Sequence, residues 1–314
     1  MRPLVWIVLG FSASAFFHGP AQAEERFAVV QTARGNQLHL FAPISVNGSK
    51  IVWFTVDTGA PISYISPELQ RALSLPTTNS ADLGFRRVST SKTPLAFAQS
   101  VKSMSMELGP GYFAEVPVAA GITMERTKEA LIPFEKAGII GMNFLLTHGA
   151  VINCRTQQIF FSRNGSTLPV TRQGYEKMGF TYLPIRITPY GFAEVQGTAA
   201  SSTYSFIVDT GAFRTTLDPA IMKRTHASHY FTGKAIILPY AGIRARLLHG
   251  KALGLKFGTQ DLSDLDVGFA EIRRLDFGTT NEYGGLIGAD LLFKRHAIID
   301  LGNRALYLMA DNKR

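Results

Sequence analysis

Two short segments of the sequence carry an aspartate in nearly identical surroundings. Residues 54–66 read Phe-Thr-Val-Asp-Thr-Gly-Ala-Pro-Ile-Ser-Tyr-Ile-Ser, and residues 206–218 read Phe-Ile-Val-Asp-Thr-Gly-Ala-Phe-Arg-Thr-Thr-Leu-Asp. One Asp-Thr-Gly is ordinary turn sequence, because an Asp side chain readily bonds to nearby backbone groups. Two copies, each preceded by an apolar run, indicate a duplicated structure that presents a pair of carboxylates, those of Asp57 and Asp209.

A pair of carboxylates is suited to hydrolysis without a covalent intermediate. Two carboxylates a few Å apart cannot both ionise cheaply, so they share one proton. The ionised member can act as a general base toward water while the protonated member polarises a carbonyl group. The pair titrates as a coupled unit, so the sequence does not assign the proton to Asp57 or to Asp209.

Two further elements repeat in the same order after each aspartate. Residues 138–145, Gly-Ile-Ile-Gly-Met-Asn-Phe-Leu, match residues 285–292, Gly-Leu-Ile-Gly-Ala-Asp-Leu-Leu. Residues 150–153, Ala-Val-Ile-Asn, match residues 297–300, Ala-Ile-Ile-Asp. Three elements in one order predict two domains that arose by duplication.

The expected organisation is a leader at residues 1–23, an N-terminal domain at 24–165 and a C-terminal domain at 166–314. The join falls in a break that contains Gly, Ser and Pro, at residues 163–169. The chain has 314 residues, 46% of them hydrophobic and 18% charged, which suits two packed domains. Many short runs rich in Val, Ile and Phe end in Gly, Pro or Asn, and this pattern predicts a mostly β protein.

These repeated residues resemble the aspartic peptidases. Asp57-Thr58-Gly59-Ala60 and Asp209-Thr210-Gly211-Ala212 are similar to the retropepsin form of the active-site loop. The repeated glycine elements resemble the family element that passes behind this loop and leads into a short helix. Retropepsins build the site from two identical chains and pepsins from two lobes of one chain. The resemblance therefore implies an all-β fold with two similar β-barrel-like lobes and a central cleft.

The resemblance also implies a role for each residue of the two loops. Asp57 and Asp209 would be catalytic, and Thr58 and Thr210 would cross-brace the loops through their hydroxyl and backbone groups. Gly59, Ala60, Gly211 and Ala212 would complete the loops. Each domain would also supply a β-hairpin flap, with candidates at residues 85–97 and 237–247. Tyr240 is the only tyrosine in these two stretches, and it has no firm match to a flap residue of the family.

The second loop departs from the first at the residues after the alanine. Pro61 follows Ala60, whereas Phe213 and Arg214 follow Ala212. An arginine at this point would lower a nearby carboxylate pKa if it pointed inward. Charged side chains are rarely buried, so a solvent-facing Arg214 is the default expectation.

The amino terminus has the pattern of an export signal. Arg2 precedes an apolar stretch from Leu4 to Phe17, and Ala21-Gln22-Ala23 fits the small-x-small cleavage pattern. The stretch is short for a membrane span of about 20 residues, although an uncleaved anchor stays an alternative. The prediction is a periplasmic or secreted monomer with no membrane contact in its mature form. Cys154, the only cysteine, is expected to be a buried and inert thiol.

No cofactor or metal site is expected. The glycine elements lack the Lys-Ser/Thr of a phosphate loop, and the histidines lack paired metal spacing. Asp261, Asp264 and Asp266 lack the spacing of a calcium loop. The net charge of +9 is scattered, without a stripe of basic and aromatic residues, so no nucleic-acid partner is expected.

The function predicted from the sequence is that of an exported aspartic endopeptidase acting on peptides or proteins. The alternative is a non-catalytic peptide-binding protein on the same fold, because fold does not imply function. Alanine in place of a hydroxyl residue after each glycine removes a possible donor to the ionised carboxylate, which should raise its pKa. We therefore expect the rate of peptide hydrolysis to be highest at mildly acidic pH.

Overall fold

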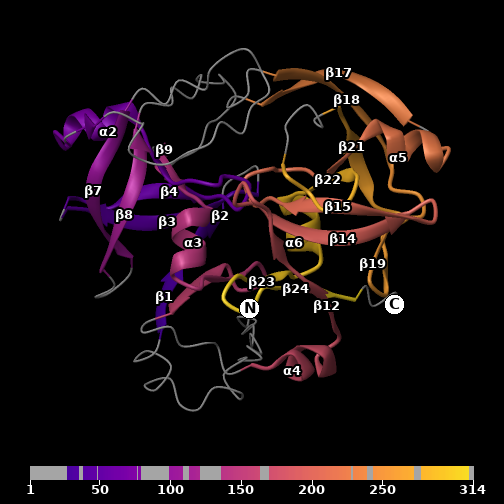
Figure 1. Ribbon diagram of the computed structural model, residues 1–314, viewed down its shortest axis with the longest axis horizontal. Helices are drawn as coiled ribbons and strands as arrows, with labels where there is room; N and C mark the ends of the chain where they lie inside the picture. Colours follow the sequence, from indigo (N-terminus) through magenta and orange to yellow (C-terminus); the bar gives the residue numbers. More distant parts are fainter. Residues whose placement is uncertain are drawn as a thin grey trace, which may run out of the picture.

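The computed structural model describes residues 27–34, 38–47, 49–75, 77–78, 99–108, 113–120, 136–162, 170–227, 229–238, 243–271 and 277–310. Within these ranges the chain forms three β-sheets and a few helices of six residues each, and the prediction of an all-β fold is confirmed (Figure 1). The candidate leader, the stretch 85–97, Tyr240 and the predicted join at 163–169 lie outside the described residues. None of the described helices has the length and apolar character needed to cross a membrane.

The first half of the chain forms an eight-stranded sheet, drawn in indigo to magenta in Figure 1. Its order is β2 (Ala33–Arg34), β3 (Leu40–Val46), β4 (Val52–Val56), β9 (Lys136–Ile140), β5 (Tyr64–Ile65), β8 (Phe113–Ala120), β7 (Gln99–Leu108) and β6 (Thr77–Thr78). An additional pairing between β3 and β7 curls this sheet toward closure. Strand β3 is buried along nearly its whole length, which explains its continuous apolar sequence.

The second half forms a ten-stranded sheet, drawn in salmon, orange and yellow. Its order is β17 (His229–Leu238), β18 (Ile243–Lys251), β21 (Asp266–Phe269), β16 (Thr216–Leu217), β22 (Tyr283–Ile287), β15 (Ser202–Val208), β14 (Ala193–Ala199), β19 (Lys256–Phe257) and β20 (Gln260–Asp261), while β13 (Arg186–Ile187) pairs with β14. Buried and exposed residues alternate at the end of β14, as expected where one face of a strand is covered.

The two sheets repeat the same pairings around each aspartate. Strand β4, which leads to Asp57, runs parallel to β9, and β15, which leads to Asp209, runs parallel to β22. Both pairs contain a register shift near their start. After each aspartate a two-residue strand crosses back, so that β5 pairs with β9 and β16 pairs with β22. The repeats found in the sequence therefore correspond to repeated strand pairings.

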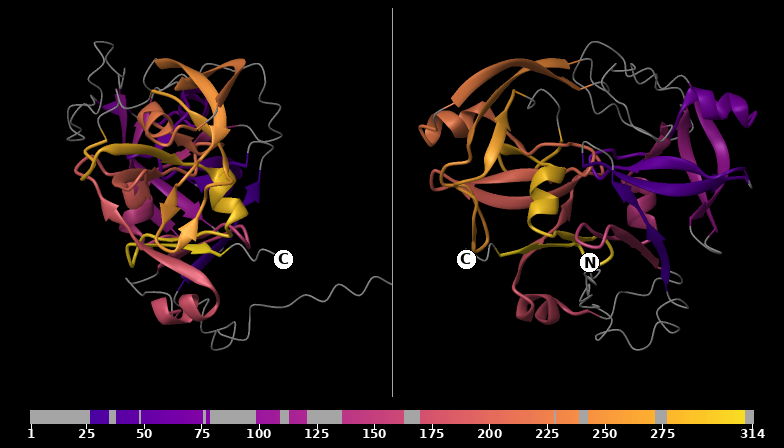
Figure 2. Two further views of the ribbon diagram at one scale, coloured as in Figure 1. Left: turned by 90° about the vertical axis from the view of Figure 1, so that its right-hand side faces the viewer. Right: turned by 180° about the vertical axis from the view of Figure 1, so that it is seen from behind.

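A third sheet of six strands joins the two halves. Its order is β1 (Phe27–Gln31), β11 (Gln158–Ser162), β10 (Val151–Asn153), β23 (Ile298–Asp300), β24 (Ala305–Met309) and β12 (Phe180–Pro184). Its central pair, β10 and β23, consists of the third repeated element, with Ile152 opposite Ile299. Figures 1 and 2 show this sheet running beneath both larger sheets. The main apolar core is continuous across all three sheets.

The helices also repeat. Helices α2 (Pro67–Ala72) and α5 (Pro219–Arg224) follow β5 and β16 and begin in the same way. Ser66 and Asp218 accept a backbone N–H of the first turn, and a proline follows each, which favours helix initiation. Helices α3 (Met142–Thr147) and α6 (Ala289–Lys294) begin directly after Gly141 and Gly288. Helix α4 (Arg172–Lys177) precedes β12.

Candidate active site

Asp57 and Asp209 lie at the ends of the two buried strands β4 and β15. The Asp57 N–H donates to Ile140 O at 3.0 Å, and the Asp209 N–H donates to Ile287 O at 2.9 Å. Each aspartate is therefore hydrogen-bonded to the strand in which its glycine element begins, β9 for Asp57 and β22 for Asp209. Asp57 is buried, and Asp209 is partly exposed.

The two loops meet so closely that each glycine contacts the carboxylate of the opposite loop. A Cβ added to Gly59 would overlap the carboxylate of Asp209, and one added to Gly211 would overlap the carboxylate of Asp57. No other residue type could occupy either position without displacing an aspartate. The structure thus brings together the two aspartates that the sequence places far apart.

The two carboxylates receive similar hydrogen bonds from their own loops. The Gly59 N–H donates to Asp57 Oδ1 at 2.8 Å, and the Gly211 N–H donates to Asp209 Oδ1 at the same distance. The Ala212 N–H adds a bond to Asp209 Oδ1 at 2.9 Å. Bonds of this kind stabilise an ionised carboxylate and orient it.

Burial raises the pKa of both carboxyl groups. The pKa of Asp57 is raised well above its usual value, first by burial and then by the charge of Asp209. Burial also raises the pKa of Asp209, against which the N–H groups of Ala212 and Gly211 act. The more buried Asp57 is therefore the member favoured to hold the shared proton, and Asp209 is the member favoured to be ionised.

Two threonines tie the loops together with four hydrogen bonds. Thr58 Oγ1 donates to Val208 O at 2.7 Å and accepts the Thr210 N–H at 3.0 Å. Thr210 Oγ1 donates to Val56 O at 2.8 Å and accepts the Thr58 N–H at 3.0 Å. The cross-brace implied by the resemblance is present, and it is symmetric. All of these groups are buried, so the bonds fix the spacing between the loops.

A second set of bonds attaches each loop to the helix behind it. Ser63 donates through its N–H and its hydroxyl to Asn143 Oδ1, both at 2.8 Å. Thr215 makes the same two bonds to Asp290 Oδ1, both at 2.7 Å. The hydroxyls of Ser63 and Thr215 in turn accept the N–H groups of Gly141 and Gly288. The glycines permit this contact, since an added Cβ would overlap the loop backbone.

An aromatic cluster lies beside the second loop and was not foreseen from the sequence. Phe277 stacks on Tyr283 with ring centroids 5.0 Å apart, and it meets Phe192 edge-on at 5.1 Å. Tyr190 and Ala212 pack against the same cluster. Phe192 and Phe277 lie outside the strands and Tyr283 begins β22, and the three aromatic residues follow no repeated sequence pattern, so only the tertiary structure reveals the cluster.

Two buried polar atoms in this area have no hydrogen-bond partner. They are the Tyr283 hydroxyl and Asp218 Oδ2. Burial raises the pKa of Tyr283 well above its usual value, and the charges of Asp209 and Asp218 add to the effect. Tyr283 is thus a neutral donor close to the second loop.

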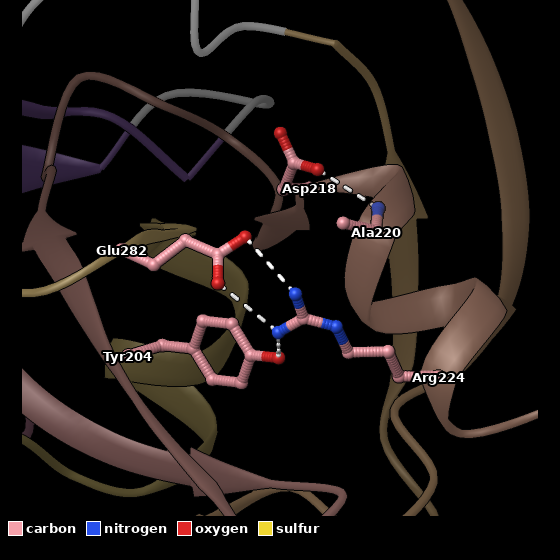
Figure 3. A network of polar contacts seen from close by, with 5 residues as sticks. All are labelled: Tyr204, Asp218, Ala220, Arg224 and Glu282. Atoms are coloured by element: carbon pink, nitrogen blue, oxygen red, sulfur yellow. Dashed lines mark hydrogen bonds and ion pairs between the residues drawn. The ribbon is translucent and has the colours of Figure 1, made fainter.

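A polar network anchors the strand that carries Asp209 (Figure 3). Arg224, at the end of α5, donates to the hydroxyl of the buried Tyr204 on β15 and forms an ion pair with Glu282 at 3.0 Å. The guanidinium lies 5.6 Å from the centre of the Tyr204 ring. Figure 3 also shows Asp218 capping the start of the same helix through Ala220. This network links β15, α5 and the residue before β22.

Arg214 is partly buried, which differs from the expectation of a solvent-facing side chain. Its guanidinium contacts Nδ1 of His249 on β18. The raised pKa values of Asp57 and Asp209 come instead from burial, acting together with groups of the two loops themselves.

Other sequence candidates are also placed. Cys154 is buried, as predicted, and burial raises its pKa to about 12, so it is not a nucleophile at neutral pH. Across the described part of the chain, no group of three or more His, Cys, Asp or Glu side chains could hold a metal ion.

Comparisons with known proteins agree with the motif at the first loop. A family model described as aspartyl protease matches residues 42–144, which include Asp57 and the first glycine element. No curated protein sequence shows significant similarity to this chain.

Solved structures also resemble the chain at low sequence identity. Basic 7S globulin from soybean has a TM-score of 0.47 and 12% identity, over 90% of this chain and 95% of that one. Conglutin gamma, a basic 7S globulin from lupine seeds, has a TM-score of 0.46 and 12% identity, over 91% and 95%. Aspartic proteinase from Irpex lacteus has a TM-score of 0.42 and 14% identity, over 91% and 98%. Family similarity at the level of sequence is thus to the aspartyl proteases, over residues 42–144.

Proposed function

We propose that this chain is an exported aspartic endopeptidase that works as a monomer, with Asp57 and Asp209 as its catalytic residues. The observation that carries the proposal is the contact of each carboxylate with the glycine of the opposite loop. This contact puts the two carboxyl groups side by side, as a shared-proton pair requires. The aspartyl protease similarity of residues 42–144 supports the same chemistry.

The proposed mechanism uses the difference between the two aspartates. Ionised Asp209 takes a proton from a water molecule while the water oxygen bonds to the carbonyl carbon of a peptide. Protonated Asp57 gives its proton to the carbonyl oxygen, which produces a tetrahedral diol. When the diol collapses, Asp57 takes back a hydroxyl proton and Asp209 donates its proton to the leaving nitrogen. The carbon–nitrogen bond breaks, and a carboxylic acid and an amine are released.

The surrounding residues would hold this geometry in place. The brace of Thr58 and Thr210 fixes the separation of the loops, and the bonds to Asn143 and Asp290 fix each loop against its helix. Small errors in such positions lower rates strongly. Activity requires one protonated and one ionised carboxyl, so the raised pKa values move the active range upward. We therefore expect an optimum at mild acidity.

The proposal is tested by replacing each aspartate separately. Asp57→Asn and Asp209→Asn should each lower kcat on a mixed peptide library at least about 1,000-fold, since neither acid–base role survives. Asp264→Asn, an exposed change on a distant loop, is the matched control and should keep wild-type activity. Wild-type hydrolysis by either site variant would overturn the mechanism. If the wild-type chain binds peptides and pepstatin but cleaves no peptide, it is the non-catalytic binding protein instead.

A further inference from the structure

The residues that follow the two Asp-Thr-Gly-Ala segments differ sharply in character. In the first loop they are Pro61 and Ile62, and only 4% of the Ile62 surface is exposed. In the second loop they are Phe213, which is 48% exposed, and Arg214, which is partly exposed. The hydrogen bonds that attach each loop to the helix behind it are the same in both halves. The two loops therefore differ in the side chains that border the aspartates.

The Arg214 side chain is held beside the second loop by β18. Its Nη1 contacts His249 Nδ1, and because arginine offers only N–H donors, the imidazole nitrogen is the acceptor. Leu247 lies two positions before His249, on the same face of β18. Leu247 packs in the aromatic cluster against which Ala212 also packs. Arg214 therefore contacts β18 two residues beyond Leu247, which packs in the cluster beside Ala212.

The positive charge of Arg214 has no carboxylate partner among the residues that the structure describes. The charge of Arg214 affects the pKa of an acidic residue, Asp266. Asp266 itself forms an ion pair with Lys251 at 2.8 Å. The pKa of Asp266 is lowered first by its bond to Lys251, with smaller contributions from Arg214 and Lys294. Asp290 accepts the N–H and hydroxyl of Thr215. The charges of Lys251, Arg214 and Lys294 thus all act on Asp266, and only Lys251 forms an ion pair with it among the described residues.

We infer that Arg214 binds an acidic side chain of the substrate, on the side of the site formed by the second loop. The inference rests on the proposed peptidase function. A planar guanidinium is well suited to a carboxylate, since it offers several N–H donors in a fixed geometry. Contact with His249 orders the arginine before substrate binds, which lowers the entropic cost of the interaction. The corresponding edge of the first loop, with Pro61 and Ile62, offers no charge.

The test uses pairs of peptides that differ only by Glu or Gln at one position, scanned over four residues on each side of the cleaved bond. The wild-type chain should favour Glu at one position about tenfold in kcat/KM, as expected for a charge-assisted hydrogen bond. Arg214→Gln should reduce the Glu/Gln ratio at that position to about one. The ratio is internal to each variant, so a general loss of activity does not affect it.

A charge reversal makes the test independent of folding losses. Arg214→Glu should favour Lys over Gln at the same position, a gain that damage to the structure could not produce. Arg155→Gln is the matched control, since it removes one charge from an exposed turn elsewhere, and it should keep the wild-type ratio.

Equal hydrolysis of Glu and Gln peptides by the wild-type chain would overturn this inference and leave the peptidase proposal standing. The same holds if Arg155→Gln abolishes the preference as fully as Arg214→Gln. Failure of the wild-type chain to cleave any peptide would overturn the peptidase proposal, and this inference with it.

Discussion

The two halves of the molecule are alike behind the aspartates and different in front of them. Strands β4 and β15 have the same partners and the same register shift, and the loops that follow have matching braces and helix contacts. The first loop continues with Pro61 and a buried Ile62, whereas the second continues with an exposed Phe213 and with Arg214. The aromatic cluster of Phe192, Phe277 and Tyr283 also borders the second loop.

This comparison separates two demands on the chain. Holding two carboxylates at a fixed distance needs the same hydrogen bonds on both sides, so the supporting residues stay equivalent. An unsymmetrical peptide presents different groups to the two sides, so residues that would contact it are free to differ. The contacts shared by the halves therefore belong to the proposed chemistry, and the differences belong to specificity.

The equivalence of the two active-site loops is tested most strongly by adding a methyl group to the glycine of each loop. Gly59→Ala and Gly211→Ala would each drive a Cβ into the opposite carboxylate, so each should lower kcat/KM at least about 100-fold. Peptide hydrolysis and circular dichroism measured together separate lost activity from lost folding.

Gly302→Ala is the control for these changes. Its added Cβ would meet only ordinary contacts, 3.5 Å or more away, and it should behave as wild type. A large effect of one loop glycine and none of the other would show that the loops do not face each other equivalently.

The brace gives the next largest effect. Thr58→Val and Thr210→Val keep the side-chain shape but leave two buried backbone groups without partners, at about 1–3 kcal/mol each. Each should lower the free energy of unfolding by about 2–6 kcal/mol in urea denaturation. Thr198→Val, on an exposed position of β14, should change it little. Unequal losses for the two brace variants would contradict a symmetric brace.

The smallest effect concerns pH and stability. The folded-state pKa of Asp57 is raised, so its contribution to stability is fully present below the unfolded carboxyl pKa of about 4 and is lost as pH rises through the folded value. Asp57→Asn removes this loss of stability, which is about 1.4 kcal/mol for each unit by which folding raises the pKa of Asp57. Its Tm should therefore exceed that of the wild type at about pH 7.5, with a smaller difference at about pH 4.

The exposed change Asp264→Asn again serves as the control, with one Tm difference at both pH values. If the Tm of Asp57→Asn does not rise relative to the wild-type Tm as pH increases, then ionisation of Asp57 does not destabilise the folded protein.

The repeated residues allowed much of this arrangement to be predicted. The paired strands, the loops, the threonine contacts and the helices after Gly141 and Gly288 all involve positions that occur twice in the sequence. The all-β fold followed from short apolar runs between turn residues. The strands that end at the aspartates followed from local pattern, whereas the threonine brace and the short helices after the glycine elements followed from the resemblance to the aspartic peptidases.

Other features depend on which distant segments meet, and no local pattern encodes this. The third repeated element was visible, but its pairing of Ile152 with Ile299 in a shared sheet was not predicted. The aromatic cluster joins Phe192 to Phe277 and Tyr283, which lie far from it in the sequence, and the three residues follow no repeated pattern. Arg214 could have faced solvent or the aspartates, and only the position of His249 on β18 determines where its guanidinium lies.

The central claim is that one chain supplies both carboxylates of a single site, and mixing the two inactive variants tests it most directly. Asp57→Asn and Asp209→Asn each lack one carboxylate, so if each site formed between two chains, every mixed pair would regain one intact site, and about half of all pairs would be mixed. Equimolar variants, unfolded together and refolded, should show no more peptide hydrolysis than either variant alone. Recovery of a substantial fraction of wild-type kcat in the mixture would contradict an intramolecular pair.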